Sequence, residues 1–256
     1  MNNLNGFLRE VWAKEVILAA RENIDLKEKV RVFTGNGTSI HVPIINPLEA
    51  NDFTGEVTVQ DASSTDGEIV LNKHKEVSFV VRDLEQAQAD ANIRAAYTED
   101  AGRAIAEAIN RDLMALYAEV SKSIGTAGTD IDEDTVLEAK LLLDNAKAPK
   151  ANRTFVVAPA QENSLLKLAR FVDMDEAKEG VLGRGYGFDF ISTADVPDVN
   201  GTHNLAFHKN AFGIGINDEP EVVAQYKAEY LGTLVVVSIN YGVKVLRDAF
   251  AIDVIS

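Results

Sequence analysis

Residues 87–118 read AQADANIRAAYTEDAGRAIAEAINRDLMALYA, and this stretch decides the fold. Eleven of its 32 residues are alanine, the residue with the highest helix propensity. No proline interrupts it and Gly102 is its only glycine, so the sequence predicts one long helix over about residues 83–120. At about 1.5 Å per residue this helix would be roughly 55 Å long, which exceeds the diameter of a small domain. We therefore expect an elongated molecule.

The charge balance and the missing residue types exclude several classes of function. The 256 residues include 25 Lys+Arg against 40 Asp+Glu, and the net charge of -15 opposes tight binding to a nucleic-acid backbone. Residues 1–34, with six cations and five anions, are the least acidic part. There is no cysteine, which excludes disulfides, thiolate nucleophiles and cysteine-bound metals. The sequence has neither a membrane-length apolar run nor a signal peptide, so we expect a soluble protein that is not exported.

The segments before the long helix begin with an arm. Apolar spacing predicts an amphipathic helix over residues 5–22, which carries Trp12. Strands are expected at 29–33 and 39–45. The Asn36-Gly37 pair between them favours the positive φ of a tight turn, so these two strands are predicted to form a hairpin.

A polar, extended segment follows at residues 46–75. Its alternating pattern predicts a long hairpin that turns at 61–67, and residues 75–82 are the expected returning strand. A two-stranded ribbon is marginally stable in water, and this one has few large apolar side chains with which to build a core. The ribbon therefore needs a further surface to lie on.

The second half of the sequence predicts mixed helices and strands. Asp132 or Asp134 is expected to cap a helix that ends near Pro149, and Pro159 is expected to begin another. Residues 172–187, which contain Gly183-Arg184-Gly185-Tyr186-Gly187, are interpreted as a mobile loop. Strands are expected at 153–158, 188–193, 204–208, 220–227, 233–246 and 249–254. Arg247-Asp248 is the predicted turn between the last two strands.

Candidate chemical sites are weak. Asp130, Asp132 and Asp134 resemble the start of a calcium loop, but the glycine and glutamate that complete such a loop are missing, so helix capping is the better interpretation. His203 and His208 are five residues apart and would point to opposite faces of a strand, which disfavours a shared metal. We predict no catalytic residue, no cofactor and no metal site. An acidic hydrolase or a calcium-binding module that uses the carboxylates of 130–134 or 173–176 stays open as an alternative.

The order of elements resembles a known family. It is an arm, an extended loop, a long helix, an acidic α/β region and a late return of strands. The passages FVVRDLEQAQAD at 79–90, TFVVAP at 154–159 and INYGVKVLR at 239–247 are similar to those of tailed-bacteriophage major capsid proteins, which have the Hong Kong 97-type coat fold. The resemblance implies an α+β fold with an N-terminal arm, an extended β-hairpin loop, a long spine helix, and peripheral and axial domains.

The resemblance also implies domain boundaries. The implied segments are the N-terminal arm at 1–34, the extended loop with flanking strands at 35–82, the peripheral domain with the spine helix at 83–153, the axial domain at 154–235 and the return strands of the peripheral domain at 236–256.

The function that the resemblance implies is that of a non-enzymatic shell protein. Copies would assemble into hexamers and pentamers of an icosahedral phage head that encloses double-stranded DNA without reading its sequence. The protein would be found in the virion after assembly in the host cytoplasm, with scaffolding and portal proteins as partners and no membrane. Scaffolding would be separate or removed beforehand, and no lysine cross-link is expected. An encapsulin-like nanocompartment shell is the alternative with the same fold.

Contacts between copies are expected at three places. These are the extended loop, the arm, and the charged turn near the end of the sequence. The predicted interface residues are Glu56, Val57, Val59, Ile69, Leu71 and Lys73 of the loop, Trp12 of the arm, and Arg247 and Asp248 of the turn.

Overall fold

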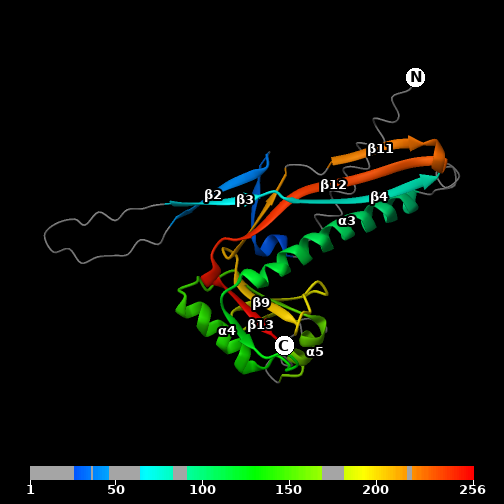
Figure 1. Ribbon diagram of the computed structural model, residues 1–256. Coiled ribbons are helices and arrows are strands. Elements are labelled where there is room, and N and C mark those ends of the chain that lie inside the picture. The colour runs from blue at the N-terminus through cyan, green and yellow to red at the C-terminus, as the bar shows by residue number, and fades with distance from the viewer. Residues whose placement is uncertain (1–25, 36, 46–63, 83–90, 169–181, 218–220) are drawn as a thin grey trace, which may run out of the picture.

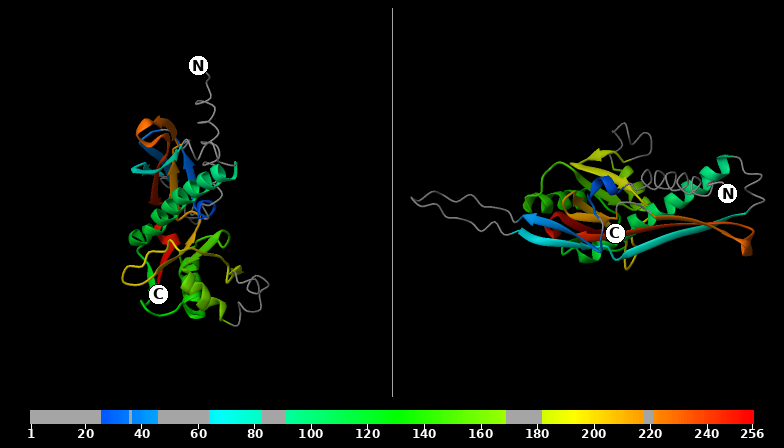
Figure 2. Two further views of the ribbon diagram at one scale, coloured as in Figure 1. Left: turned by 90° about the vertical axis from the view of Figure 1, so that its right-hand side faces the viewer. Right: turned by 90° about the horizontal axis from the view of Figure 1, so that it is seen from above.

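The computed structural model describes residues 26–35, 37–45, 64–82, 91–168, 182–217 and 221–256. Two bodies are joined along one long helix, and a hairpin projects from them (Figure 1). Viewed from above, the molecule is long and narrow (Figure 2). The expectation of an elongated molecule is therefore confirmed.

The first body is a five-stranded sheet that packs on the long helix. Strand β12 is its centre, because it pairs with β10 and β11 along one edge and with β4 along the other. The strands are β1 (Arg31–Thr34), β4 (Lys73–Arg82), β10 (Phe212–Ile216), β11 (Glu221–Lys227) and β12 (Gly232–Val245). The short 3-10 turns η1 (Lys27–Lys29) and η3 (Ala228–Tyr230) belong to the same body.

The long helix is α3 (Ala91–Met114), which continues as the 3-10 turn η2 (Ala115–Glu119). Its 24 residues give a rod of about 36 Å. Ile105, Ile109 and Leu113 lie at the spacing of one helix face and are at most 3% exposed, in a core shared with Phe212 and Tyr241 of the sheet. The predicted helix is confirmed from residue 91 to its end near residue 120, and residues 83–90 lie outside the described part.

The second body is a six-stranded sheet with two helices. Its strands are β5 (Ser123–Gly125), β6 (Arg153–Val157), β7 (Arg184–Gly185), β8 (Phe188–Ser192), β9 (His203–His208) and β13 (Ala251–Ile255). The helices are α4 (Glu133–Asn145) and α5 (Pro159–Leu166), and the 3-10 turn η4 (Asp248–Phe250) precedes β13. Val136 and Leu143 of α4 pack with Phe155, Phe188 and Val254 in a separate core.

The predicted hairpin between residues 29–33 and 39–45 is wrong. β1 instead pairs in parallel with β10, and β2 (Ser39–Ile45) pairs with β3 (Ser64–Val70) in a two-stranded sheet. The pairing with β10 holds Val30, which is 2% exposed, in the core next to the long helix. Burial by distant partners thus outweighs the local turn preference of Asn36-Gly37.

An extended hairpin is present, but its strands are not the predicted ones. The structure pairs β3 with β2 at residues 39–45, and the predicted turn at 61–67 is already part of β3 from Ser64 onward. The last described pair is Ile45 with Ser64. Residues 46–63, and with them Glu56, Val57 and Val59, lie outside the described residues, as does the arm helix with Trp12.

The two sheets divide the chain differently from the expected boundaries. Those boundaries place α4 in the peripheral domain, but it packs on the six-stranded sheet. They place β10 and β11 in the axial domain, but both pair with β12. They assign β13 to the peripheral return, yet it lies between β5 and β9. The hydrogen-bonding partners of these strands lie far away in the sequence, and they decide to which sheet each strand belongs.

The interpretation of residues 172–187 as a mobile loop is wrong for the glycine-rich passage at 183–187. β7 and β8 pair with Gly185 opposite Phe188, so Tyr186 and Gly187 form a two-residue hairpin turn. Their φ values are 52° and 90°, the positive values that such a tight turn requires. The Tyr186 hydroxyl donates a hydrogen bond to Glu133 at 2.5 Å, which ties the turn to α4.

Candidate assembly surfaces

The base of the β2–β3 hairpin lies directly on bare backbone of the five-stranded sheet. A Cβ atom at Gly242 would stand 2.1 Å from the carbonyl oxygen of Val70, and Cβ atoms at Gly213 and Gly215 would lie 3.2 Å from the Ile69 side chain. Only glycine permits this approach. The Lys244 ammonium also donates to the carbonyl oxygen of Glu68 at 2.8 Å. The hairpin is therefore held firmly where it leaves the body.

Two predicted interface residues contribute to this attachment. Ile69 is fully buried inside its own chain, so it has no surface to offer a neighbouring copy. Leu71 lies against Gly215, where a Cβ atom would be 3.0 Å from its Cδ2. Their apolar side chains were the signal for an interface, and the structure uses them to fix the hairpin.

A charged cluster joins the start of β4 to the long helix. Lys73 Nζ lies 3.0 Å from Asp112 Oδ1, Lys75 Nζ lies 3.7 Å from Oδ2, and the Tyr241 hydroxyl donates to Oδ2 at 2.5 Å. Burial alone would raise the pKa of Asp112, but the hydrogen bonds from Tyr241 and Lys73 and the two ammonium charges outweigh it and lower that pKa. Lys73, a predicted interface residue, thus pairs with its own spine helix.

The charged turn between β12 and β13 connects the two bodies. Asp248 accepts a hydrogen bond from the backbone N–H of Ser121 at 2.8 Å and a second from the Ser121 hydroxyl. The Arg247 guanidinium lies over the Phe250 ring, 5.5 Å from its centroid, which is a cation–π contact. Both charged side chains are half-buried. They hold the crossover in place, and a contact with another copy would use their exposed parts.

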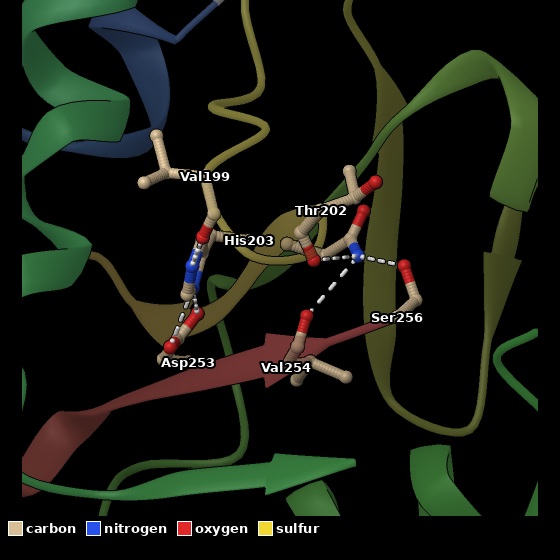
Figure 3. A network of polar contacts seen from close by, with 7 residues as sticks. Val199, Thr202, His203, Asp253, Val254 and Ser256 are labelled. Atoms are coloured by element: carbon tan, nitrogen blue, oxygen red, sulfur yellow. Dashed lines mark hydrogen bonds and ion pairs between the residues drawn. The ribbon is translucent and has the colours of Figure 1, made fainter. Parts of the chain in front are cut away.

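His203 lies in a buried polar environment in the second body. His203 Nδ1 lies 2.9 Å from Asp253 Oδ2, and Nε2 lies 3.0 Å from the Val199 carbonyl oxygen (Figure 3). The ring also stacks on Tyr117. Burial raises the pKa of Asp253, although His203 opposes the rise. The interpretation of His203 as a hydrogen-bonded strand histidine is confirmed.

Asn204 is a buried polar residue that the sequence did not single out. It is fully buried, and its amide group donates to the carbonyl oxygens of Thr202 and Val254 and to the Ser256 hydroxyl at 3.2, 3.1 and 3.0 Å. Its side-chain oxygen accepts from the Ala158 N–H at 2.9 Å. The network in Figure 3 therefore fastens the last residues of the chain to β9. It is structural, since every polar group of Asn204 has a partner.

The carboxylates at 130–134 serve to cap a helix. Asp132 precedes α4, and its Oδ1 accepts hydrogen bonds from the N–H and hydroxyl of Thr135 at 2.8 and 2.6 Å. The capping interpretation is confirmed. Within the described ranges no three His, Asp or Glu side chains come together in a way that could hold a metal ion. In the same part of the chain, no helix is long and apolar enough to cross a membrane.

Exposed apolar side chains gather at the β11–β12 hairpin, at the opposite end of the molecule from β2–β3 (Figure 1). Leu231 is 67% exposed and has a φ of 46°, a left-handed conformation that is costly for leucine. The other members are Val223, Tyr226 and Tyr230. A cluster of exposed apolar side chains indicates a contact surface. We name these four residues the β11–β12 tip.

A family model described as phage capsid protein matches residues 72–254. The chain belongs to the phage capsid protein family. A search of curated proteins found no match. The match includes the long helix, the six-stranded sheet and, apart from β1, the five-stranded sheet, so family membership and the two-body architecture rest largely on the same residues.

Solved structures show the same fold. A structure of Mycobacterium phage Che8 is 19% identical, covers 86% of this chain and 85% of its own, and has a TM-score of 0.68. The capsid of an empty GTA particle is 14% identical, covers 91% and 90%, and has a TM-score of 0.71. A virus-like particle from Pyrococcus furiosus is 14% identical, covers 96% and 98%, and has a TM-score of 0.65.

These comparisons confirm the sequence prediction of a phage capsid protein with the α+β, Hong Kong 97-type coat fold. This capsid protein is a structural component of a shell and not an enzyme. The glycine platform at Gly213, Gly215 and Gly242 and the Asp112 cluster were not found from the sequence. Glycines inside strands were the available signal, because they often mark a close approach of another backbone.

Proposed function

We propose that this capsid protein assembles into hexamers and pentamers of an icosahedral phage head that encloses double-stranded DNA. The observation that carries the proposal is the attachment of the β2–β3 hairpin. Its base is fixed on the glycine platform, and its strands lead away from the body (Figure 1). A projecting two-stranded ribbon gains stability when another copy covers it.

The end of the molecule opposite the β2–β3 hairpin supports the same proposal. The β11–β12 tip exposes four large apolar side chains at the far end of the long sheet. A molecule with a contact element at each end can bind two neighbours at once, which is what closed rings and shells require. Scaffolding and portal proteins are the proposed partners, and the assembled virion, built in the host cytoplasm, is the proposed location. The net charge of -15 is compatible with a container that does not adhere to packed DNA.

The test is a variant that lacks only the outer part of the hairpin. Ile45 and Ser64 are directly paired, so replacing residues 46–63 by Asn-Gly closes the ribbon with a two-residue turn. The deletion stops before β3, because Ile69 belongs to the core. We expect unchanged circular dichroism and thermal unfolding, and a loss of closed particles in negative-stain micrographs. Closed particles from this variant would contradict the role of the hairpin.

A genome-free compartment is the second candidate, because the fold matches the Pyrococcus furiosus virus-like particle over nearly its full length. Particles purified from cells that produce the phage separate the two functions. We expect nuclease-resistant double-stranded DNA of uniform length inside them. Particles that contain only protein cargo would favour the compartment.

A further inference from the structure

Both ring nitrogens of His203 face hydrogen-bond acceptors. Nδ1 lies 2.9 Å from a carboxylate oxygen of Asp253, and Nε2 lies 3.0 Å from the carbonyl oxygen of Val199 (Figure 3). A neutral imidazole has a single N–H, so it can donate only one of these two bonds, and its other nitrogen would turn a lone pair toward an acceptor. Both bonds form when both nitrogens carry a proton, which makes the ring an imidazolium.

His208, on the same strand, has the opposite arrangement. Its Nδ1 lies 3.1 Å from the backbone N of Asn210 and accepts a hydrogen bond from that N–H, so Nδ1 cannot carry a proton. Burial and the charge of Arg153 lower the pKa of His208, which agrees with a neutral ring. The two buried histidines of β9 therefore differ in the protonation that their hydrogen bonds require.

The groups that face His203 favour one bound proton. Among the described residues, Asp253 of β13 is the only charged group that contacts the ring. The other neighbours are neutral: the Tyr117 ring of η2 stacks on the imidazole with 3.9 Å between the ring centroids, and the segment after β8 contributes the Val199 carbonyl. A buried carboxylate is costly unless a positive charge lies beside it, and a protonated His203 supplies that charge.

The proton of this pair belongs on the imidazole. Burial raises the pKa of Asp253, while His203 and the Ser123 hydroxyl oppose the rise, so the pair as a whole holds a proton more readily than an exposed carboxylate would. Imidazole is the stronger base of the two groups by about 2–3 pKa units in their ordinary states. Asp253 therefore stays an acceptor, and His203 donates to it.

The Val199 carbonyl belongs to the 193–202 segment, which connects β8 to β9 and touches both bodies. At the end of the segment, Thr202 exchanges two backbone hydrogen bonds with Ser256 of the second body. Nearer its start, Asp195 lies 3.8 Å from the guanidinium of Arg111 on the long helix. The segment thus bridges the long helix and the second body, and the His203 ring lies at this joint.

We propose that His203 is a pH-sensitive latch, which as an imidazolium ties the Val199 carbonyl, and with it the 193–202 segment, to Asp253 at the joint between the two bodies. When the proton is lost, the remaining N–H stays with the carboxylate, and the Val199 carbonyl faces a lone pair instead of a donor. The closed latch holds the proton, so raising the pH opens it. Opening loosens the segment that bridges the long helix and the second body. This device acts within one chain and does not depend on the proposed shell function.

Nitrogen-15 NMR of the unassembled full chain tests the protonation directly, because the shift of a ring nitrogen shows whether it carries a proton. The chain has four histidines, so replacing each of the other three by glutamine assigns His203 by elimination. We expect both nitrogens of His203 to be protonated at pH 5.5 and one of them to be bare at pH 8.5. A His203 ring that is neutral at pH 5.5, or that keeps both protons up to pH 9, would overturn the latch.

Hydrogen exchange measured by mass spectrometry tests the effect on the segment. After correction for the intrinsic pH dependence of exchange, amides in 193–202 should be about tenfold better protected at pH 5.5 than at pH 8.5, since one charge-assisted hydrogen bond is lost. Amides of α4 should show no such difference. His203→Gln should abolish the pH difference, and the matched control His208→Gln should keep it.

The outcomes are independent of particle formation. Equal protection of 193–202 at both pH values, or a pH difference that persists in His203→Gln, would refute the latch and leave the shell function untouched. Failure of the unmodified chain to form particles would refute the shell function and leave the latch untouched. The NMR titration follows His203 in chains that keep this residue, so it decides the question even if His203→Gln does not fold.

Discussion

Replacing Gly242 by alanine should detach the extended hairpin from the sheet. The added Cβ would stand 2.1 Å from the carbonyl oxygen of Val70 and 2.9 Å from its carbonyl carbon. Both are backbone atoms, so no side-chain rotation can relieve the clash. Overpacking of a core costs about 1–3 kcal/mol, and a backbone clash belongs at the upper end, so we expect a loss of about 3 kcal/mol. That corresponds to a fall in Tm of roughly 6–12 °C for a chain of this size.

The assay compares thermal unfolding of unassembled Gly242→Ala with Gly35→Ala. A Cβ at Gly35 would meet only the Ile40 side chain, at 3.4 Å or more, so this control should change Tm by less than about 2 °C. Gly242→Ala should also lose particle formation in negative-stain micrographs, because the hairpin no longer leaves the body at a fixed angle. A Gly242→Ala protein that unfolds and assembles like the control would refute the glycine platform.

Three further changes test the charged clusters and the tip. Asp112→Asn should lower the free energy of unfolding by about 1–2 kcal/mol near pH 7, because the bonds to Lys73 and Tyr241 become weaker. Since the folded-state pKa of Asp112 is lowered, urea titrations should show the stability difference between variant and unmodified protein shrinking as the pH falls below the ordinary value of 3.8. Burial raises the folded-state pKa of Asp253, so its contribution to the free energy of unfolding is fully present below the ordinary value of 3.8 and is lost as the pH rises through the raised value. Asp253→Asn should remove this pH-dependent contribution when unfolding is measured from pH 3 to 8. Leu231→Gly should raise stability by about 0.5 kcal/mol in thermal unfolding by relieving a positive φ, while light scattering should show weaker assembly from the loss of an exposed apolar contact.

The sequence predicted the elements whose signals are local. Alanine content and the absence of proline identified the long helix, and the Asp132 cap and Pro159 placed the starts of α4 and α5. These signals act within a few residues, so distant parts of the chain do not change them. Six strands of the second half were predicted for a similar reason, namely β6, β8, β9, β11, β12 and β13, whereas β5, β7 and β10 were not predicted.

The errors arose where distant segments decide the structure. β10, with the sequence Phe-Gly-Ile-Gly-Ile, has two glycines that disfavour a strand, and they are present because Ile69 packs over them. The Asn36-Gly37 signal failed because β1 has its partner in β10. Ile69 and Lys73 were predicted as interface residues between copies, and the structure shows both in contacts within the chain. Hydrophobicity and charge do not reveal whether a contact is with the same chain or with another.

β12 extends for 14 residues, about 46 Å, from the β11–β12 tip to the crossover into the second body. The same strand carries Leu234 opposite β4, Gly242 beneath the hairpin base and Val245 beside β10. A force applied at either extremity is therefore transmitted along a single covalent backbone to the other. In the proposed assembly, with contacts at both ends of the molecule, the twist of this one strand would set the angle between successive copies, so we expect substitutions along it to alter the curvature of the particle.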